Sequence, residues 1–209
     1  MDVDLKSKLR WVYSSESSDD LRQKYDSWAS EYDKHQLHER TGWIAPHKIV
    51  EYLKKYIAKD CWILDAGAGT GLAGEVLNKE GYKNLTGIDL SNKMMAEAIK
   101  KDVYKNYYLM DLTKKLNFGN NTFDAVIIVG VFACGHVGAE VLMNLIPIVK
   151  KEGYIVFTVR EDFYESSNFK EKIGVYVKKN QITLIEKSEV YQAFKNHAIL
   201  HHIEVYSIK

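Results

Sequence analysis

The sequence predicts an α/β protein with a doubly wound, mostly parallel sheet, and three observations lead to this fold class. From residue 61 onward, short apolar segments alternate with segments that carry apolar residues at helical spacing, which is typical of strand–helix–strand units. Three glycines follow the first apolar segment directly, where such folds turn from a strand into a helix. The last two apolar segments have too short a connection for a helical crossover, so we expect them to pair antiparallel.

The first sixty residues are predicted to be helical, since they contain no convincing strand. One stripe of a helix from residue 18 to about 38 carries Leu21, Tyr25, Trp28 and Tyr32. A second helix starts at Pro46, a residue suited to the first helical turn, and continues to Ile57. We expect one domain over residues 1–209, with residues 1–58 as a helical cap over the site and residues 59–209 as the α/β core.

The core elements follow in order along the chain. The predicted strands are residues 61–67, 84–90, 106–111, 123–132, 154–160, 182–190 and 198–209. The predicted helices are residues 72–81, 91–102, 138–153 and 168–180, the third of them interrupted by Pro147.

Composition restricts the class of protein. Hydrophobic residues make up 46% of the 209 residues and charged residues 27%, which indicates a soluble globular chain. A net charge of +1 favours neither nucleic acid nor an anionic membrane as a partner. The two cysteines have no metal-ligand spacing, the longest apolar stretch is too short to span a bilayer, and the first twenty residues do not form a signal peptide. We therefore expect a cytoplasmic protein without a metal, nucleic-acid or membrane partner, as a monomer or weak homodimer.

The glycine loop after the first strand points to a ligand that approaches the backbone closely. Gly67, Gly69 and Gly71 have no Cβ, and free N–H groups of the following helix point into the same space. Their spacing is G-x-G-x-G, preceded by Asp65, whereas the dinucleotide fingerprint is G-x-G-x-x-G. A phosphate-binding G-K-S/T sequence is absent from the chain. Taken alone, such a loop is equally consistent with a tight strand-to-helix turn.

Two further acids end the next two strands. Asp89 follows Asp65 by 24 residues (89 − 65), and Asp111 ends the third strand. A carboxylate at the tip of the second strand can accept hydrogen bonds from both hydroxyls of a ribose, and Asp111 comes within reach of an adenine amino group. Either acid alone could be a helix cap, but the loop and both acids together predict a nucleoside site.

These segments resemble the motifs of the class I S-adenosylmethionine-dependent methyltransferases. "DAGAGTG" resembles their E/D-x-G-x-G-x-G motif, "GIDLS" their ribose-binding motif and "LMDL" their adenine-side motif. The segment "LIPIVKKEG" resembles their "LKPGG" turn, but its "KKEG" part lacks the proline and the second glycine of that turn. The resemblance implies a Rossmann-like sheet of seven strands in the order 3-2-1-4-5-7-6, with strand seven antiparallel.

The same resemblance implies S-adenosyl-L-methionine as the cofactor and S-adenosyl-L-homocysteine as the product. The three loop glycines would lie against the methionyl part of the cofactor, Asp89 would hold its ribose and Leu90 would pack on its adenine. The expected cofactor-binding residues of this part of the chain are Asp65, Gly67, Ala68, Gly69, Gly71, Asp89, Leu90, Met110, Asp111, Leu112 and Val129.

The predicted cap has two segments that extend the resemblance. "YDSWASEYD" resembles a segment of small-molecule methyltransferases that folds over the cofactor, and Tyr25, Trp28 and Tyr32 in it could attract a sulfonium or could be ordinary core. "HERTGWIAP" resembles the Williams–Beuren syndrome chromosome region methyltransferase-like proteins. There Arg40 could pair with the cofactor carboxylate or lie on the surface, and Trp43 could line the substrate pocket.

The loop after the fourth strand is expected to face the transferable methyl group. His136 is its candidate general base, although methyl transfer to a good nucleophile can proceed by alignment alone. Phe132 and Arg160 are candidate substrate contacts. We expect methyl transfer to a small molecule by direct displacement. The alternatives are a catalytically silent protein that binds the cofactor or its product for regulation and, less favoured, a nicotinamide-dependent oxidoreductase.

Overall fold

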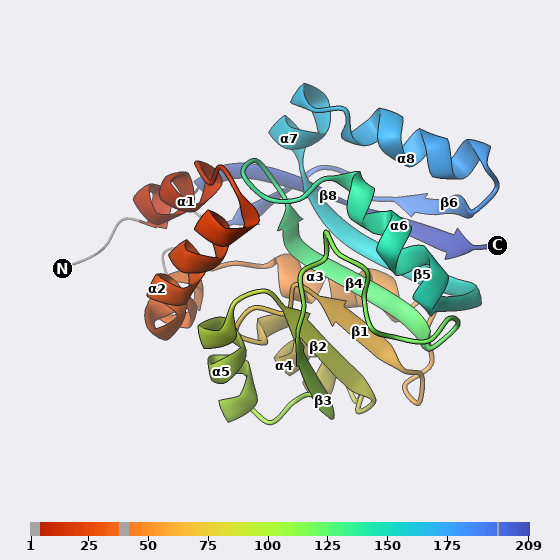
Figure 1. The fold of residues 1–209 in the computed structure, drawn as a ribbon, viewed down its shortest axis with the longest axis horizontal. Helices are drawn as coiled ribbons and strands as arrows, with labels where there is room; N and C mark the ends of the chain where they lie inside the picture. The colour runs from red at the N-terminus through yellow and green to blue at the C-terminus, as the bar shows by residue number, and fades with distance from the viewer. Residues whose placement is uncertain (1–4, 38–41, 196) are drawn as a thin grey trace.

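The computed structural model describes residues 5–37, 42–195 and 197–209 (Figure 1). The helices are α1 (Leu5–Tyr13), α2 (Ser18–Leu37), α3 (Ala45–Leu53), α4 (Leu72–Lys79), α5 (Asn92–Lys100), α6 (Leu142–Leu145), α7 (Glu161–Ser166) and α8 (Phe169–Lys178), with short 3-10 turns η1 (Ala139–Val141) and η2 (Ile146–Ile148) on either side of α6. The strands are β1 (Ile63–Ala66), β2 (Leu85–Asp89), β3 (Asn106–Leu109), β4 (Phe123–Phe132), β5 (Val149–Arg160), β6 (Ile182–Lys187), β7 (Tyr191–Phe194) and β8 (His197–Ile208).

The strands form one mostly parallel sheet in the order β3-β2-β1-β4-β5-β8-β6. β1 to β5 pair in parallel, whereas β8 inserts antiparallel between β5 and β6. The sheet order reverses between β1 and β4, which is where open α/β sheets bind ligands. The predicted fold class is confirmed, with β8 in the place expected for strand seven.

The expected count of seven strands is wrong, because the described residues contain eight. The additional strand is β7, which lies in the segment expected to be a plain connection and pairs antiparallel with the first half of β8. At twelve residues, β8 is long enough to pair with β5 at residues 201–207, with β6 at residues 204–208 and with β7 at residues 197–201.

Helices cover both faces of the sheet, as near-continuous apolar strands require (Figure 1). On one face Ile49, Leu77 and Met95 of α3, α4 and α5 join a core that also includes Leu9 and Trp28 of α1 and α2. On the other face α6 and α8 pack over Phe157 and Tyr206 of the sheet. The expected cap helix from Pro46 is α3, and it lies against the sheet face beside α4, so the helices at the carboxyl ends of the strands are α1 and α2.

The predicted helix over residues 138–153 forms only in part. η1, α6 and η2 together cover residues 139–148, irregular as expected around Pro147, and β5 already begins at Val149. Pro147 cannot donate to a helical hydrogen bond, and the backbone carbonyls of Pro147 and Ile148 instead accept from Asn121 and Thr122. Glu152 has a φ of 61°, so the turn without the expected glycine pair is made by a non-glycine residue in the left-handed region. No helix in the described part of the chain is both long enough and apolar enough to cross a membrane.

Candidate active site

The glycine loop after β1 turns sharply, and two of its glycines have different structural roles. Gly67 and Gly69 have φ angles of 85° and 55°, in the left-handed region that side chains disfavour. A Cβ on Gly67 would lie 2.5 Å from Cγ2 of Val131, so this glycine allows the loop to pack on β4. A Cβ on Gly69 would meet no atom within 4 Å. Gly69 therefore presents bare backbone to an open space, as close approach of a ligand requires.

Asp89, at the end of β2, is tied to this loop. One carboxylate oxygen accepts the Gly69 N–H at 2.8 Å, and the other accepts the Ser91 N–H, also at 2.8 Å. Burial raises the pKa of Asp89, while the backbone N–H donors of Ser91 and Gly69 counteract this shift. The carboxylate is thereby held at the rim of the loop with lone pairs left for a ligand.

A pocket opens between the glycine loop, the ends of β2 to β4 and the helix α2. Its empty space is about 700 Å³, a figure that includes space open to solvent. Predicted site residues that line it are Tyr25, Tyr32, Gly67, Gly69, Asp89, Leu90, Met110, Asp111, Leu112, Val129 and His136. The structure thus brings residues from five separate segments of the chain to one cavity.

A smaller hollow on the other side of the loop contains three more of the predicted residues. Trp43, Asp65 and Ala68 line it together with Thr70, and Gly67 and Gly69 lie between it and the larger pocket. Asp65 is buried, and its Oδ2 accepts the Tyr104 hydroxyl at 2.6 Å. Its Oδ1 is buried without a partner. Burial raises the pKa of Asp65 to about 7, against the lowering effect of Tyr104, so this acid is suited to receive a cationic donor.

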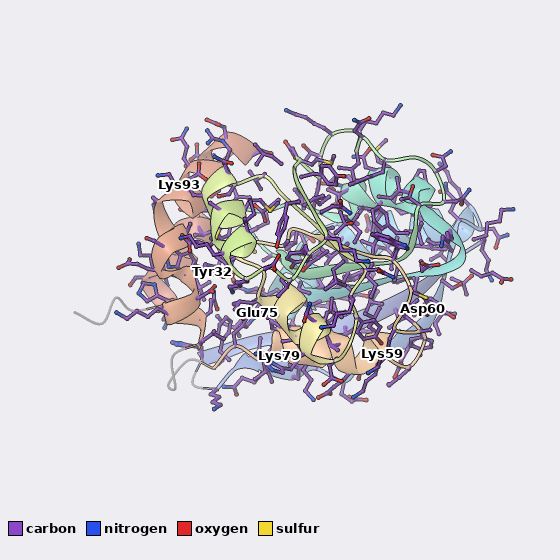
Figure 2. The ribbon with its side chains drawn as sticks, turned by 90° about the horizontal axis from the view of Figure 1, so that it is seen from below. Tyr32, Lys59, Asp60, Glu75, Lys79 and Lys93 are labelled. Carbon is purple, nitrogen blue, oxygen red and sulfur yellow. The ribbon has the colours of Figure 1, made fainter. Side chains whose placement is uncertain are left out.

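The aromatic residues of α2 have two roles, since some line the pocket and one packs behind them. Tyr25 and Tyr32 line the pocket, and Figure 2 shows Tyr32 on the side of α2 that faces the body of the molecule. Trp28 is fully buried, stacks parallel to Tyr25 with ring centroids 6.3 Å apart, and donates its Nε1–H to His35. Trp28 therefore supports the pocket wall from behind and does not face the cavity.

His136 lies in the loop after β4 with both ring nitrogens engaged. Nδ1 is 3.1 Å from the Cys134 carbonyl and Nε2 is 2.7 Å from the Tyr25 hydroxyl. A carbonyl only accepts, so Nδ1 carries the proton and Nε2 accepts the hydroxyl of Tyr25. Burial is the main cause that lowers the pKa of His136 to about 4, with Arg160 contributing. His136 is therefore neutral at physiological pH.

Two aspartates of α2 fix the helix to α5 and to the glycine loop. Asp26 accepts the Ser91 hydroxyl at 2.6 Å and the Lys93 N–H at 3.2 Å, at the start of α5. Figure 2 shows Lys93 at that end of α5, beside α2. Asp33 accepts the hydroxyl of Thr70 in the glycine loop and pairs with Lys101 at 2.5 Å. The helix that covers the pocket is thus held by the loops that form its floor.

Among the described residues, three predicted ones besides Trp28 line neither cavity. Gly71 begins α4, where a Cβ would lie 3.3 Å from Ala98 and from Tyr104, so it serves helix packing. Phe132 is a correction, because it packs with Phe157 and Phe169 on the opposite face of the sheet. Phe132 lies four residues after Ile128 and six after Val126. Because side chains alternate along a strand, all three lie on the same face of β4. Arg160 lies against Tyr13, next to the pocket wall, and Arg40 lies outside the described residues.

Several pocket residues were missed from the sequence. Ser18, Leu21, Met94, Gly130, Val131 and Val137 also line the larger cavity. Met94 follows the "GIDLS" motif by a helical turn, so the predicted cap at Ser91 could have indicated it. Tyr104, which bonds Asp65, lies in an irregular segment with no local signal, and only the tertiary fold brings it there.

Comparison with known proteins agrees with this geometry. Residues 64–157 match the family described as "Methyltransferase domain". Methyltransferase-like protein 27 of Homo sapiens is 32% identical over 160 residues, which are 73% of this chain and 63% of that protein. The 18S rRNA (guanine-N(7))-methyltransferase of Bos taurus is 39% identical over 69 residues, 33% of this chain and 24% of that protein. The chain thus spans less than two thirds of the length of either relative.

Solved structures share the fold at low sequence identity. The [4+2]-cyclase SpnF superposes with a TM-score of 0.72 at 12% identity, over 93% of this chain and 97% of that one. A TehB-like methyltransferase from Corynebacterium glutamicum ATCC 13032 superposes with a TM-score of 0.65 at 17% identity, over 90% of this chain and 99% of that one. At such identities the likeness concerns the fold alone.

The fold, the site and the family match together support a class I S-adenosylmethionine-dependent methyltransferase domain in this chain. The similarity to methyltransferase-like protein 27 covers 73% of the chain. The family match favours a methyltransferase over the less favoured prediction of a nicotinamide-dependent oxidoreductase.

Proposed function

We propose that this chain binds S-adenosylmethionine in the larger pocket and transfers its methyl group to a small-molecule acceptor. Residues 1–58 and 59–209 would act as a single domain, with α1 and α2 covering the site. The cofactor would lie along the glycine loop, with its ribose on Asp89 and its adenine among Leu90, Met110 and Leu112.

The charge of the pocket carries this proposal. Asp89 and Asp111 line it, Asp65 lies behind the loop, and no lysine or arginine is among the described lining residues. A dinucleotide or nucleoside triphosphate would bring several negative charges against these acids, at an electrostatic cost. A nucleoside with a sulfonium and an ammonium group suits them, and the unpartnered Oδ1 of Asp65 offers an acceptor for the ammonium. The bare backbone at Gly69 leaves room for the methionyl chain.

The residues around the pocket define how the reaction would proceed. When bound, S-adenosylmethionine would supply a methyl group on a positively charged sulfur, which is the leaving group when an acceptor atom attacks the methyl carbon in line. The rings of Tyr25 and Tyr32 offer negative faces to that positive charge and exclude water from it. Alignment of acceptor and methyl group between α2 and the end of β4 would provide most of the rate enhancement.

His136 is the candidate to take a proton from the acceptor. Its Nε2 is the unprotonated nitrogen, so it can accept a proton once the Tyr25 hydroxyl moves away. Its pKa of about 4 makes it a weak base, which suits an acceptor that is already a good nucleophile. We therefore propose positioning of the acceptor as the principal role of His136, and proton removal as the secondary one.

Two alternatives concern the acceptor and catalysis itself. The bovine relative is named for an RNA substrate, but its similarity covers a third of this chain. A pocket covered by α1 and α2 favours a small acceptor over a nucleotide within RNA. A regulatory protein that binds the cofactor without catalysis would share every feature of the cofactor half of the site.

Activity screening separates these possibilities. The protein is incubated with S-adenosylmethionine carrying a deuterated methyl group and a library of small metabolites, and products are found by mass. The proposal predicts transfer of the labelled methyl to a metabolite, reduced in the His136→Ala variant. Transfer to RNA alone would refute a small-molecule acceptor. Tight cofactor binding without transfer to any acceptor would support the regulatory alternative.

A further inference from the structure

Three side chains on adjacent antiparallel strands form a row next to the pocket. Arg160 of β5 pairs in register with His201 of β8, and His201 pairs in register with Tyr191 of β7. Cross-strand partners project from the same face of a sheet, with Cβ atoms about 5 Å apart. The His201 and Tyr191 rings accordingly have centroids 6.2 Å apart. We refer to Arg160, His201 and Tyr191 as the cross-strand row.

Each member of the cross-strand row has a buried polar atom without a hydrogen-bond partner. These atoms are Nη1 of Arg160, Nδ1 of His201 and the hydroxyl oxygen of Tyr191. His201 is only 5% exposed, so surface water does not satisfy it. Buried polar groups nearly always have partners, and three orphaned atoms in register on one face therefore indicate a ligand.

The charges in the cross-strand row favour an anion. Nη2 of Arg160 is held by Asp162 at 2.5 Å, and the other oxygen of Asp162 accepts the Phe163 N–H at 2.8 Å. Arg160 also has a side-chain hydrogen bond with Tyr13, while its Nη1 is without a partner. Burial lowers the pKa of His201 to about 3, with Arg160 contributing, so the imidazole is neutral and can donate one N–H. With the Tyr191 hydroxyl, the row offers three donors.

The cross-strand row lies on the acceptor side of the site. The Arg160 guanidinium is 4.5 Å from the centroid of the Tyr13 ring, and this ring packs edge-on against His136 at 5.5 Å. His136 in turn lines the pocket. The ring of Tyr13, the last residue of α1, therefore contacts both Arg160 at one end of the row and His136 in the pocket wall.

We infer that the cross-strand row binds the carboxylate of the methyl acceptor, so that the acceptor is a small carboxylic acid. The inference rests on the proposed function, because it assigns the acceptor in that same site. Since Asp162 already offsets much of the Arg160 charge, the row suits a single negative charge better than the double charge of a phosphate. The acceptor atom would then lie beyond Tyr13, next to His136.

Binding of matched acids and amides tests the inference. Benzoate and its neutral isostere benzamide are titrated calorimetrically into the full-length protein, with and without saturating S-adenosylhomocysteine. We expect benzoate to bind at least about tenfold more tightly than benzamide, and Arg160→Gln to abolish this preference. Tyr191→Phe and His201→Phe should each weaken benzoate binding about three- to tenfold. Arg10→Gln, at an exposed arginine of α1, should change nothing.

The contrary results are equally distinct. Equal binding of acid and amide, including no binding of either, would overturn the inference. So would a crystal structure grown with benzoate in which water alone contacts the three orphaned atoms. S-adenosylhomocysteine affinity should be unchanged by Arg160→Gln, because Arg160 does not line the cofactor pocket. Failure of the wild-type protein to bind S-adenosylhomocysteine would refute the proposed function, while the titration without it still decides the role of the row.

Discussion

The two halves of the pocket are built in different ways. The proposed cofactor half consists of backbone and acids from consecutive strand ends, with Gly69 bonded to Asp89 across the β1–β2 pair. The proposed acceptor half consists of side chains from distant parts of the chain, such as Tyr25 of α2 bonded to His136 after β4. The first half depends on local motifs and the second on how α1 and α2 pack on the sheet.

This difference indicates which part of the site can vary among proteins of the class. The cofactor half needs glycines at fixed φ and an acid at one strand tip, so few substitutions preserve it. The acceptor half needs only aromatic and polar groups that pack well, and many sets of side chains meet that need. Substitutions in the cofactor half should therefore have the larger effects on cofactor binding.

The largest effect is expected from Asp89→Ala. This change removes the acceptor for the ribose and also leaves the Gly69 and Ser91 N–H groups without their partner. Loss of the two charge-assisted hydrogen bonds to the ribose hydroxyls, about 3 kcal/mol together, should weaken S-adenosylhomocysteine binding about 100-fold or more. Calorimetric titration measures this. Asp111→Asn, in the same pocket, should weaken binding less than about tenfold, and equal losses would contradict the distinct role of Asp89.

The next largest effect is the change with pH in the unfolding free energy that depends on Asp65. Its pKa of about 7 in the folded state lies above the usual 3.8, so the folded state holds the proton more tightly than the unfolded state. The stability that this gives is complete below about pH 4 and is lost as the pH rises through about 7. The difference in unfolding free energy between wild type and Asp65→Asn should therefore fall by about 2–4 kcal/mol from about pH 4 to about pH 8.

Denaturant unfolding across this pH range gives the difference, and contributions from other groups cancel because both proteins share them. Asp60→Asn, at an exposed aspartate labelled in Figure 2, should give a difference that changes by less than about 0.5 kcal/mol. A wild-type minus Asp65→Asn difference that is equally flat would contradict the buried, unpartnered carboxyl.

A smaller effect is expected from Gly69→Ala. The added Cβ meets no protein atom but forces alanine into the left-handed region at φ 55° and places a methyl group in the ligand space. We expect a loss of about tenfold in S-adenosylhomocysteine affinity and about 1 kcal/mol in stability. Gly174→Ala, in α8 with equally open space, should instead raise stability by about 0.5–1 kcal/mol. Opposite signs in thermal unfolding would support the contrast, and equal signs would contradict it.

The smallest effect on cofactor affinity is expected in the acceptor half. Tyr25→Phe keeps the ring in the pocket wall and removes only the hydroxyl bonded to His136. S-adenosylhomocysteine affinity should change less than about threefold, whereas Tyr25→Leu, which removes the ring, should cost about five- to tenfold. Calorimetry on both variants tests this, and an equal loss in both would show that the hydroxyl matters as much as the ring.

The sequence was most informative where function depends on local backbone. The glycine spacing and the acids at Asp89 and Asp111 could be predicted because both follow from short segments at strand ends. β7 and the partner of Asp65, Tyr104, could not, because each depends on long-range pairing that no local pattern records. Phe132 shows a different failure, since strand alternation already indicated the opposite face.

Separate calorimetric titrations of the wild-type protein with S-adenosylhomocysteine and with NAD⁺ decide whether the pocket binds a methyl-donor nucleoside or a dinucleotide. A pocket lined by Asp89 and Asp111, without a described lysine or arginine, should bind S-adenosylhomocysteine with a Kd of about 10 µM or tighter. NAD⁺ should give no binding heat at the same concentrations. Binding of NAD⁺ in preference to S-adenosylhomocysteine would contradict the account.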